Sequence, residues 1–159
     1  MSVRILYVYA VDQERIVLPE MFNVDYLMTG IGKCNAAYAL TRRLCMHPEA
    51  YDMVLNIGTA GTLRFQGGDI LFCNRFVDRD LEKLKDYGLT YGVDSLYDGV
   101  CLSHVGEDWI KRGFTVNTGD DFVTSSQTVE GDVVDMEAYA LACMSADGRS
   151  VRFCKICYG

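Results

Sequence analysis

Hydrophobic residues along this chain gather in short runs that are separated by glycine-rich and polar segments. The clearest runs cover residues 3–11, 52–57 and 151–157, and they are rich in valine, isoleucine, tyrosine and cysteine. Nearly continuous apolar runs of this length are typical of strands buried on both faces of a sheet. Shorter strands are predicted at residues 26–28, 70–73, 100–102, 114–116 and 133–134.

Two segments between these strands have a helical pattern. One runs from Ala36 to Met46, with Asn35 as the expected N-cap and Pro48 beyond its end. The other is the alanine-rich stretch 136–144. Strands that alternate with helices predict an α/β protein with helices on both faces of the sheet. The polar stretch 75–97 is expected to run over the surface.

Length and charge narrow the range of functions. The 159 residues suggest one domain, and half of them are hydrophobic. A formal net charge of -7 argues against nucleic acid and anionic membranes as partners. The apolar runs are far too short to span a membrane, and the N-terminus shows no signal peptide. Seven scattered cysteines in such a chain indicate reduced core residues and a cytoplasmic protein.

Cys154 and Cys157 form a C-x-x-C pair that needs separate consideration. A zinc site would require a second pair or nearby histidines, and the only histidines are His47 and His104. We therefore predict no metal and no other cofactor, and interpret the pair as part of a buried strand.

Acidic residues follow two of the predicted strands. Glu14 comes just after the first one, where it can act as a general base or simply begin a helix. Asp135 and Glu137 flank Met136 where a strand becomes a helix. A carboxylate there can accept hydrogen bonds from two ribose hydroxyls above an apolar methionine, or it can cap the helix.

Three glycine-containing turns complete the candidate chemistry. The segment 30–33 is neither a P-loop nor a dinucleotide fingerprint, because Cys34 and Asn35 break those patterns. Small residues at 58–61 allow backbone amides and the Thr59 hydroxyl to approach a ligand, or form an ordinary tight turn. Phe122, after Gly119-Asp120-Asp121, can stack on a flat base or belong to the core.

The order of these motifs is informative as a set. G-I-G-K, N-I-G-T-A-G, G-D-x-F and V-x-M-E-A resemble the 5'-methylthioadenosine/S-adenosylhomocysteine nucleosidase branch of the nucleoside phosphorylase and nucleosidase superfamily. The resemblance extends from residue 3 to about residue 157. It implies a single domain over 1–159 with a three-layer αβα fold around a mostly mixed sheet. It also implies a purine nucleoside as ligand, hydrolysis of its N-glycosidic bond with release of adenine, and a homodimer.

Residue roles come from the same resemblance. Glu14 would orient and deprotonate the attacking water, while Met136 and Glu137 would hold the ribose. Phe122 would stack on the purine, and the backbone of Val123 would read the edge of the base. Thr59 and Gly61 would line the sugar and the water.

Two positions separate this chain from its relatives. Phosphorylases in the superfamily carry an arginine where this chain has Asn56, which favours hydrolysis over phosphorolysis. The family's last strand ends in Ser-Asp or Thr-Asp, whereas this chain has Cys157-Tyr158-Gly159. We expect an incomplete C-terminal strand and helix, and binding with weak turnover. A futalosine hydrolase and a nucleoside-binding protein without catalysis are the alternatives.

Overall fold

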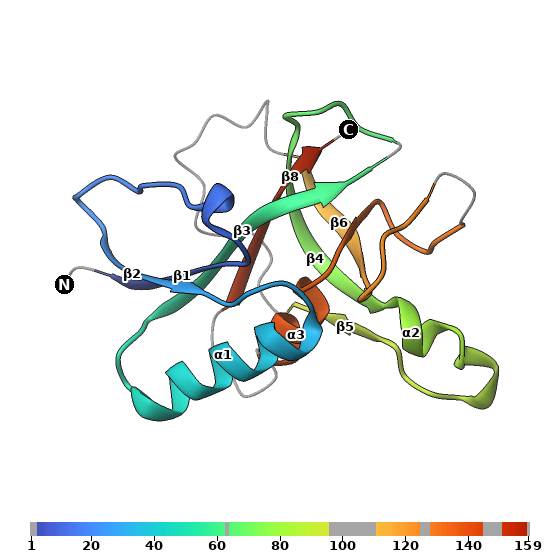
Figure 1. Ribbon diagram of the computed structural model, residues 1–159, viewed down its shortest axis with the longest axis horizontal. Coiled ribbons are helices and arrows are strands. Elements are labelled where there is room, and N and C mark those ends of the chain that lie inside the picture. The colour runs from blue at the N-terminus through green and yellow to red at the C-terminus, as the bar shows by residue number, and fades with distance from the viewer. Residues whose placement is uncertain (1–2, 63, 96–110, 125–127, 145–150, 159) are drawn as a thin grey trace.

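The computed structural model describes residues 3–62, 64–95, 111–124, 128–144 and 151–158, and these ranges form one mixed sheet with helices packed beneath it (Figure 1). The strands are β1 Arg4–Tyr9, β2 Asn23–Met28, β3 Met53–Gly61, β4 Ile70–Asp78, β5 Gly92–Asp94, β6 Lys111–Thr118, β7 Val133–Asp135 and β8 Val151–Tyr158. The α-helices are α1 Lys33–Met46, α2 Arg79–Glu82 and α3 Ala138–Cys143, and the 3-10 helices are η1 Asp12–Glu14 and η2 Lys85–Tyr87. In these ranges no helix has the length and apolar character that crossing a membrane requires.

The N-terminal half is a parallel arrangement around β1. This strand pairs with β2 on one side and with β3 on the other, and α1 connects β2 to β3. The apolar run predicted from the sequence explains the strand, since five of its six residues are buried. Ala36, Leu40 and Leu44 recur every four residues, so α1 turns one apolar face toward the sheet.

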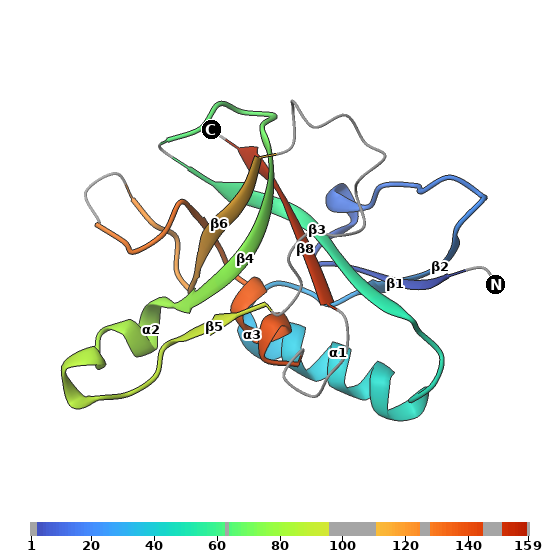
Figure 2. The same cartoon turned by 180° about the vertical axis from the view of Figure 1, so that it is seen from behind.

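Five strands close into a barrel-like ring. β3 pairs with β8, β8 with β4, and β4 with β6 (Figure 2). β6 then pairs with β7, which returns to β3. The sheet is mixed, as the sequence predicted, but its closure was not foreseen. Register shifts between β4 and β6 at Phe72, Cys73 and Arg75 bend the sheet, as β-bulges do.

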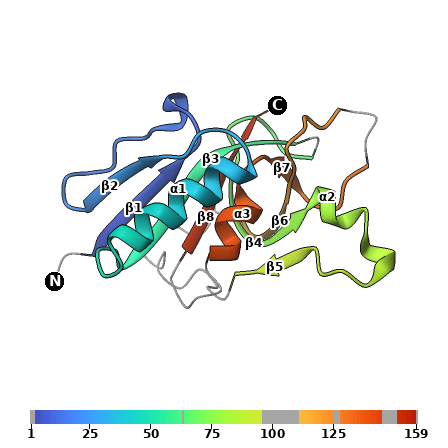
Figure 3. The ribbon, with the colours of Figure 1, turned by 60° about the horizontal axis from the view of Figure 1, so that its bottom comes forward.

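The hydrophobic core lies between this sheet and the two longer helices. Figure 3 shows α1 and α3 side by side in front of the strands. Side chains from both helices and from six strands share one buried cluster: Leu6, Val8, Ala36, Leu40, Leu44, Val54, Ala60, Leu71, Cys73, Phe76, Val116, Val133, Ala138, Leu141, Ala142, Phe153 and Cys157.

The prediction of a surface segment at 75–97 is wrong in its first part. β4 continues to Asp78, and Phe76, Val77, Asp78 and Arg79 are all buried. Two of these residues are charged, so composition alone suggested exposure. Their charges are compensated by ion pairs inside the fold, which a reading of local polarity does not detect. The strand predicted at 100–102 lies outside the described residues.

Two local predictions also need correction. Gly32, not Asn35, precedes α1, and the Asn35 side chain donates instead to the Ile31 carbonyl at 2.7 Å. Residues 58–61 are not a turn, because β3 continues through them beside β8. The strand is long enough here to take part in closing the ring, which a search for glycine-rich turns would miss.

Candidate active site

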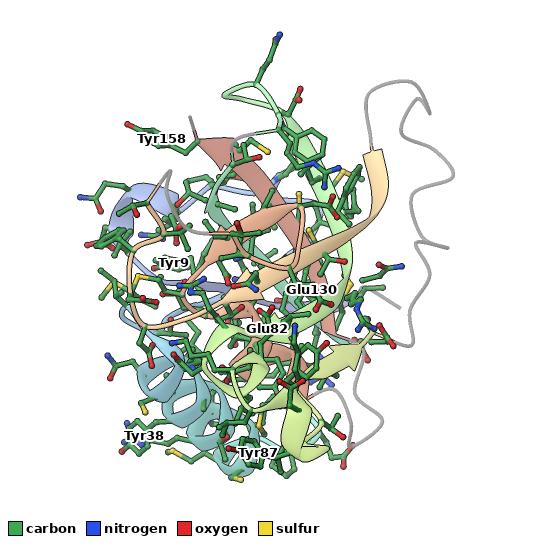
Figure 4. All side chains as sticks on the ribbon, turned by 90° about the vertical axis from the view of Figure 1, so that its right-hand side faces the viewer. Tyr9, Tyr38, Glu82, Tyr87, Glu130 and Tyr158 are labelled. Atoms are coloured by element: carbon green, nitrogen blue, oxygen red, sulfur yellow. The ribbon has the colours of Figure 1, made fainter. Side chains whose placement is uncertain are left out.

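One cavity of about 370 Å³ opens where several strands end. Its walls come from η1, from the end of β3, from the segment after β6 and from the junction of β7 with α3. All seven residues singled out in the sequence line this one cavity: Glu14, Thr59, Gly61, Phe122, Val123, Met136 and Glu137. Tyr158 also lines it, and Figure 4 shows this residue at the end of β8, far from Tyr38 on α1.

Glu14 occupies a gap along the edge of β3. That strand pairs with β1 as far as Asn56 and with β7 only at Gly61. Between these points the Thr59 N–H donates to the Glu14 carboxylate at 2.7 Å, and the Thr59 hydroxyl donates at 2.6 Å. The other carboxylate oxygen accepts from the Ala10 N–H at 2.9 Å. The carboxylate therefore takes the place of a neighbouring strand and has a fixed orientation.

Glu137 enters the cavity from the other side. Its carboxylate accepts a hydrogen bond from the Gly32 N–H at 2.9 Å. Burial raises the pKa of Glu137, and the charges of Asp135 and Glu14 raise it further, whereas the bond from Gly32 lowers it. The glycine turn before α1 therefore holds a site residue, a role that its sequence did not reveal.

A buried ion pair lies beneath these two glutamates. Lys155 on β8 meets Asp135 at 2.8 Å, and each side chain is 1% exposed. Burial alone would lower the pKa of Lys155, but attraction by Asp135, Glu137 and Glu14 outweighs it and raises that pKa. A β-carbon on Gly58 would stand 3.3 Å from the Lys155 ammonium and 3.4 Å from the Glu14 carboxylate. The Lys155 ammonium therefore neutralises part of the negative charge of Asp135, Glu137 and Glu14.

The structure gives Asp135 and Glu137 different contacts, whereas the sequence left helix capping and ligand binding open for both. Asp135 accepts from the Ala138 N–H at 2.8 Å and from the Thr118 hydroxyl at 2.6 Å, so it caps α3. Glu137 precedes the same helix but makes no side-chain capping bond. Its carboxylate is therefore available to the cavity, as the ribose hypothesis requires.

The segment that carries Phe122 is fixed by a buried arginine. Arg79 bonds both the side chain and the carbonyl of Asp121, and it donates to Asn117 Oδ1 at 2.8 Å. A β-carbon on Gly119 would come within 2.5 Å of the guanidinium, so any larger residue there would displace Arg79. Phe122 itself is 85% exposed at the rim of the cavity. An apolar ring in that position is consistent with stacking on a base and not with the core alternative.

The C-x-x-C pair lies in β8, as predicted. Cys154 and Cys157 are both buried, and burial raises the pKa of Cys154 to about 11. Cys73 on the neighbouring β4 behaves alike, with burial raising its pKa to about 12. The Cys154 and Cys73 thiols therefore stay protonated near neutral pH. Among the described residues, no group of three or more histidine, cysteine or acidic side chains is placed to hold a metal ion.

Proteins of similar sequence and fold include nucleosidases. The chain matches no protein-family model. It is 30% identical over 142 residues to the 5'-methylthioadenosine/S-adenosylhomocysteine nucleosidase of Marinomonas sp. (strain MWYL1), which covers 76% of this chain. The chain spans 60% of the length of that relative.

Solved structures share the fold at lower identity. The nucleosidase of Neisseria meningitidis in complex with methylthio-immucillin-A has a TM-score of 0.75 and 21% identity to this chain. The match covers 97% of this chain and 84% of the Neisseria chain. The nucleosidase of Streptococcus pneumoniae in complex with 8-aminoadenine has a TM-score of 0.73 and 22% identity, and the match covers 97% of this chain and 84% of the Streptococcus chain. Futalosine hydrolase of Helicobacter pylori strain 26695 has a TM-score of 0.74 and 17% identity, and the match covers 99% of this chain and 88% of the hydrolase chain.

Proposed function

Because this chain resembles the 5'-methylthioadenosine/S-adenosylhomocysteine nucleosidases in sequence and has their fold, we propose that it hydrolyses the N-glycosidic bond of a purine nucleoside. The observation that carries the proposal is the convergence of Glu14 and Glu137 on one cavity, each held by backbone N–H groups. Such fixed carboxylates face the place where positive charge would develop on the ribose. Preorganised charges of this kind are a major source of rate acceleration.

In the proposed reaction, Glu14 accepts a proton from water as the water oxygen bonds to the anomeric carbon of the ribose. The bond from that carbon to the purine nitrogen breaks, and its electron pair leaves with the base, which takes up a proton from solvent while Glu14 returns its proton to solvent. Glu137 would accept hydrogen bonds from the ribose hydroxyls, with Met136 below the sugar. Phe122 would stack on the base beside the backbone of Val123, and Thr59 and Gly61 would line the sugar side.

The substituent at the 5' carbon distinguishes the two enzymatic candidates. 5'-Methylthioadenosine or S-adenosylhomocysteine is the first choice, and futalosine is the second because a futalosine hydrolase has the same fold. A base-release assay with each nucleoside separates them: adenine from the first pair supports our proposal, and hypoxanthine from futalosine alone supports the second. Calorimetric binding of an adenosine analogue with no base release would identify a binding protein instead.

Replacing Glu137 by alanine should weaken nucleoside binding much more than adenine binding. The change removes the acceptor for the ribose hydroxyls and leaves the base contacts alone. Hydrogen bonds to a charged group contribute about 1.5–3 kcal/mol, so the Kd for the nucleoside should rise by roughly ten- to a hundredfold. Isothermal titration with both ligands tests this, with Glu20→Ala on the exposed surface as the control. Equal losses for nucleoside and adenine would rule out the ribose role.

Base release is also expected to proceed without phosphate. Asn56, at the position of the phosphorylase arginine, is 3% exposed and donates to the Val8 carbonyl at 3.0 Å. Among the charged residues that line the cavity, Arg79 is already bonded to Asp121, while Glu14 and Glu137 would repel a phosphate. The measurement is product analysis in phosphate-free buffer, where the ribose should form with its 5' substituent and with a hydroxyl instead of a phosphate on the anomeric carbon. Strict dependence on phosphate would reverse the assignment to hydrolysis.

From the resemblance we also propose a role in methionine salvage, a cytoplasmic location, a homodimer and a three-layer αβα arrangement. Exposed apolar side chains near the start of α1 support association, since Ile31 is 54% and Tyr38 69% exposed. Sedimentation of the purified chain tests the dimer.

A further inference from the structure

We propose that Tyr7 is a positioning residue that fixes the catalytic carboxylate of Glu14 through the backbone; this inference rests on the proposed function. Tyr7 lies in the middle of β1, is not among the residues that line the cavity, and contacts the turn that carries Glu14. Neither its position in the sequence nor the resemblance assigns it any role.

The Tyr7 hydroxyl joins two points of that turn. It donates to the carbonyl oxygen of Glu14 at 2.6 Å, and it accepts from the Ile16 N–H at 3.4 Å. Burial raises the pKa of Tyr7, so the hydroxyl keeps its proton. A single phenol therefore bonds the chain on both sides of Arg15.

The ring behind this hydroxyl cannot move easily. Tyr7 is fully buried, stacks on Tyr9 with ring centroids 5.4 Å apart, and meets Tyr26 edge-on at 5.5 Å. Tyr26 in turn accepts from the Leu18 N–H at 3.1 Å. Tyr26 therefore bonds the chain at Leu18, beyond the turn that Tyr7 holds.

Apolar packing contributes little to the turn itself. η1 is three residues long, its N-cap Val11 makes no side-chain bond, and none of its residues is buried. Ile16 and Val17 beyond it are exposed. The Glu14 N–H bonds the Val11 carbonyl at 3.0 Å within the turn, and the Glu14 carboxylate is held by the Ala10 and Thr59 N–H groups. The Tyr7 hydroxyl provides the bonds that join the backbone on both sides of Arg15 to the buried side of β1. A displacement of about 1 Å in a reacting group can cost roughly a hundredfold in rate.

Tyr7→Phe is the direct test, because it removes the hydroxyl and keeps the buried ring. The kcat for base release should fall by about 10- to 100-fold while KM changes less than threefold, since Glu14 touches the water and not the base. Tyr26→Phe is the matched control: it removes a hydroxyl from the same cluster and should leave kcat within about twofold. Equal losses in both variants, or no loss in Tyr7→Phe, would overturn the inference.

A double-mutant cycle separates positioning from general damage. If Tyr7 acts through Glu14, adding Tyr7→Phe to Glu14→Gln should lower the remaining rate by less than about twofold. A further tenfold loss on that background would contradict the inference.

Hydrogen exchange provides a measure that does not depend on activity. Tyr7→Phe should speed exchange of the Ala10 and Thr59 amides, which the Glu14 carboxylate holds, by at least about tenfold, and Tyr26→Phe should not. If the parent chain released no base but these amides responded, the proposed function would fail and the positioning contact would stand. Unchanged exchange would refute the contact whatever the activity.

Discussion

Glu14→Gln is expected to lower the rate of base release by roughly 10²–10⁴-fold, the usual contribution of a general base. The amide has the shape of the carboxylate but cannot accept a proton from water near neutral pH. Its oxygen can still accept from Thr59, while its NH₂ group must face the Ala10 N–H. Nucleoside affinity should therefore change much less than the rate. Initial rates of adenine release, measured beside calorimetric titration, give both quantities.

Asp12→Asn supplies the control for this experiment. Asp12 lies in the same 3-10 helix and is exposed, so the same chemical change there should leave the rate within about twofold. Turnover of Glu14→Gln comparable to that of the parent would show that another group activates the water. It would also show that the converging carboxylates serve binding alone.

Lys155→Met should produce the largest loss of stability of any change considered for this chain. Methionine fills a similar volume, but it leaves the Asp135 carboxylate buried without its cation. Breaking a buried pair in this way costs about 3–5 kcal/mol, a large share of the stability of a typical domain. Urea unfolding followed by circular dichroism measures the loss. Lys83→Met removes an exposed lysine from its pair with Asp80 and should cost less than about 1 kcal/mol.

The sequence was sufficient to predict every described strand except β5 and, through the resemblance, seven of the residues that line the cavity. Apolar runs identified β1 and β8, whose described side chains are mostly buried, and β3, in which every second residue is buried. The motifs identified Glu14 and Glu137 as acids that follow strands, and the strand pairings bring both to one cavity. Local patterns carry this information, so reading along the chain recovers it.

What the sequence did not reveal depends on contacts between distant segments. Lys155 looked like one polar residue in an apolar run, and only the pairing of β8 with β3 brings it beneath Glu14. Arg79 looked like part of a polar surface, yet Asp121, 42 residues away, compensates its charge inside the fold. The closed ring likewise follows from the strand pairings rather than from any one segment. A buried charge can be recognised only when its partner is known.

The place of the Glu14 carboxylate along β3 has a consequence for how this position can vary. Because it satisfies the Thr59 N–H on the edge of β3 opposite β8, between the pairings with β1 and β7, the sheet itself requires an acceptor there. Changes that abolish the acceptor should harm folding as well as chemistry, so selection for folding alone would retain an acid or amide at this position. A relative that had lost the reaction would still be expected to carry glutamate, glutamine or a similar residue. Searches for inactive descendants should therefore examine what surrounds position 14 and not that position alone.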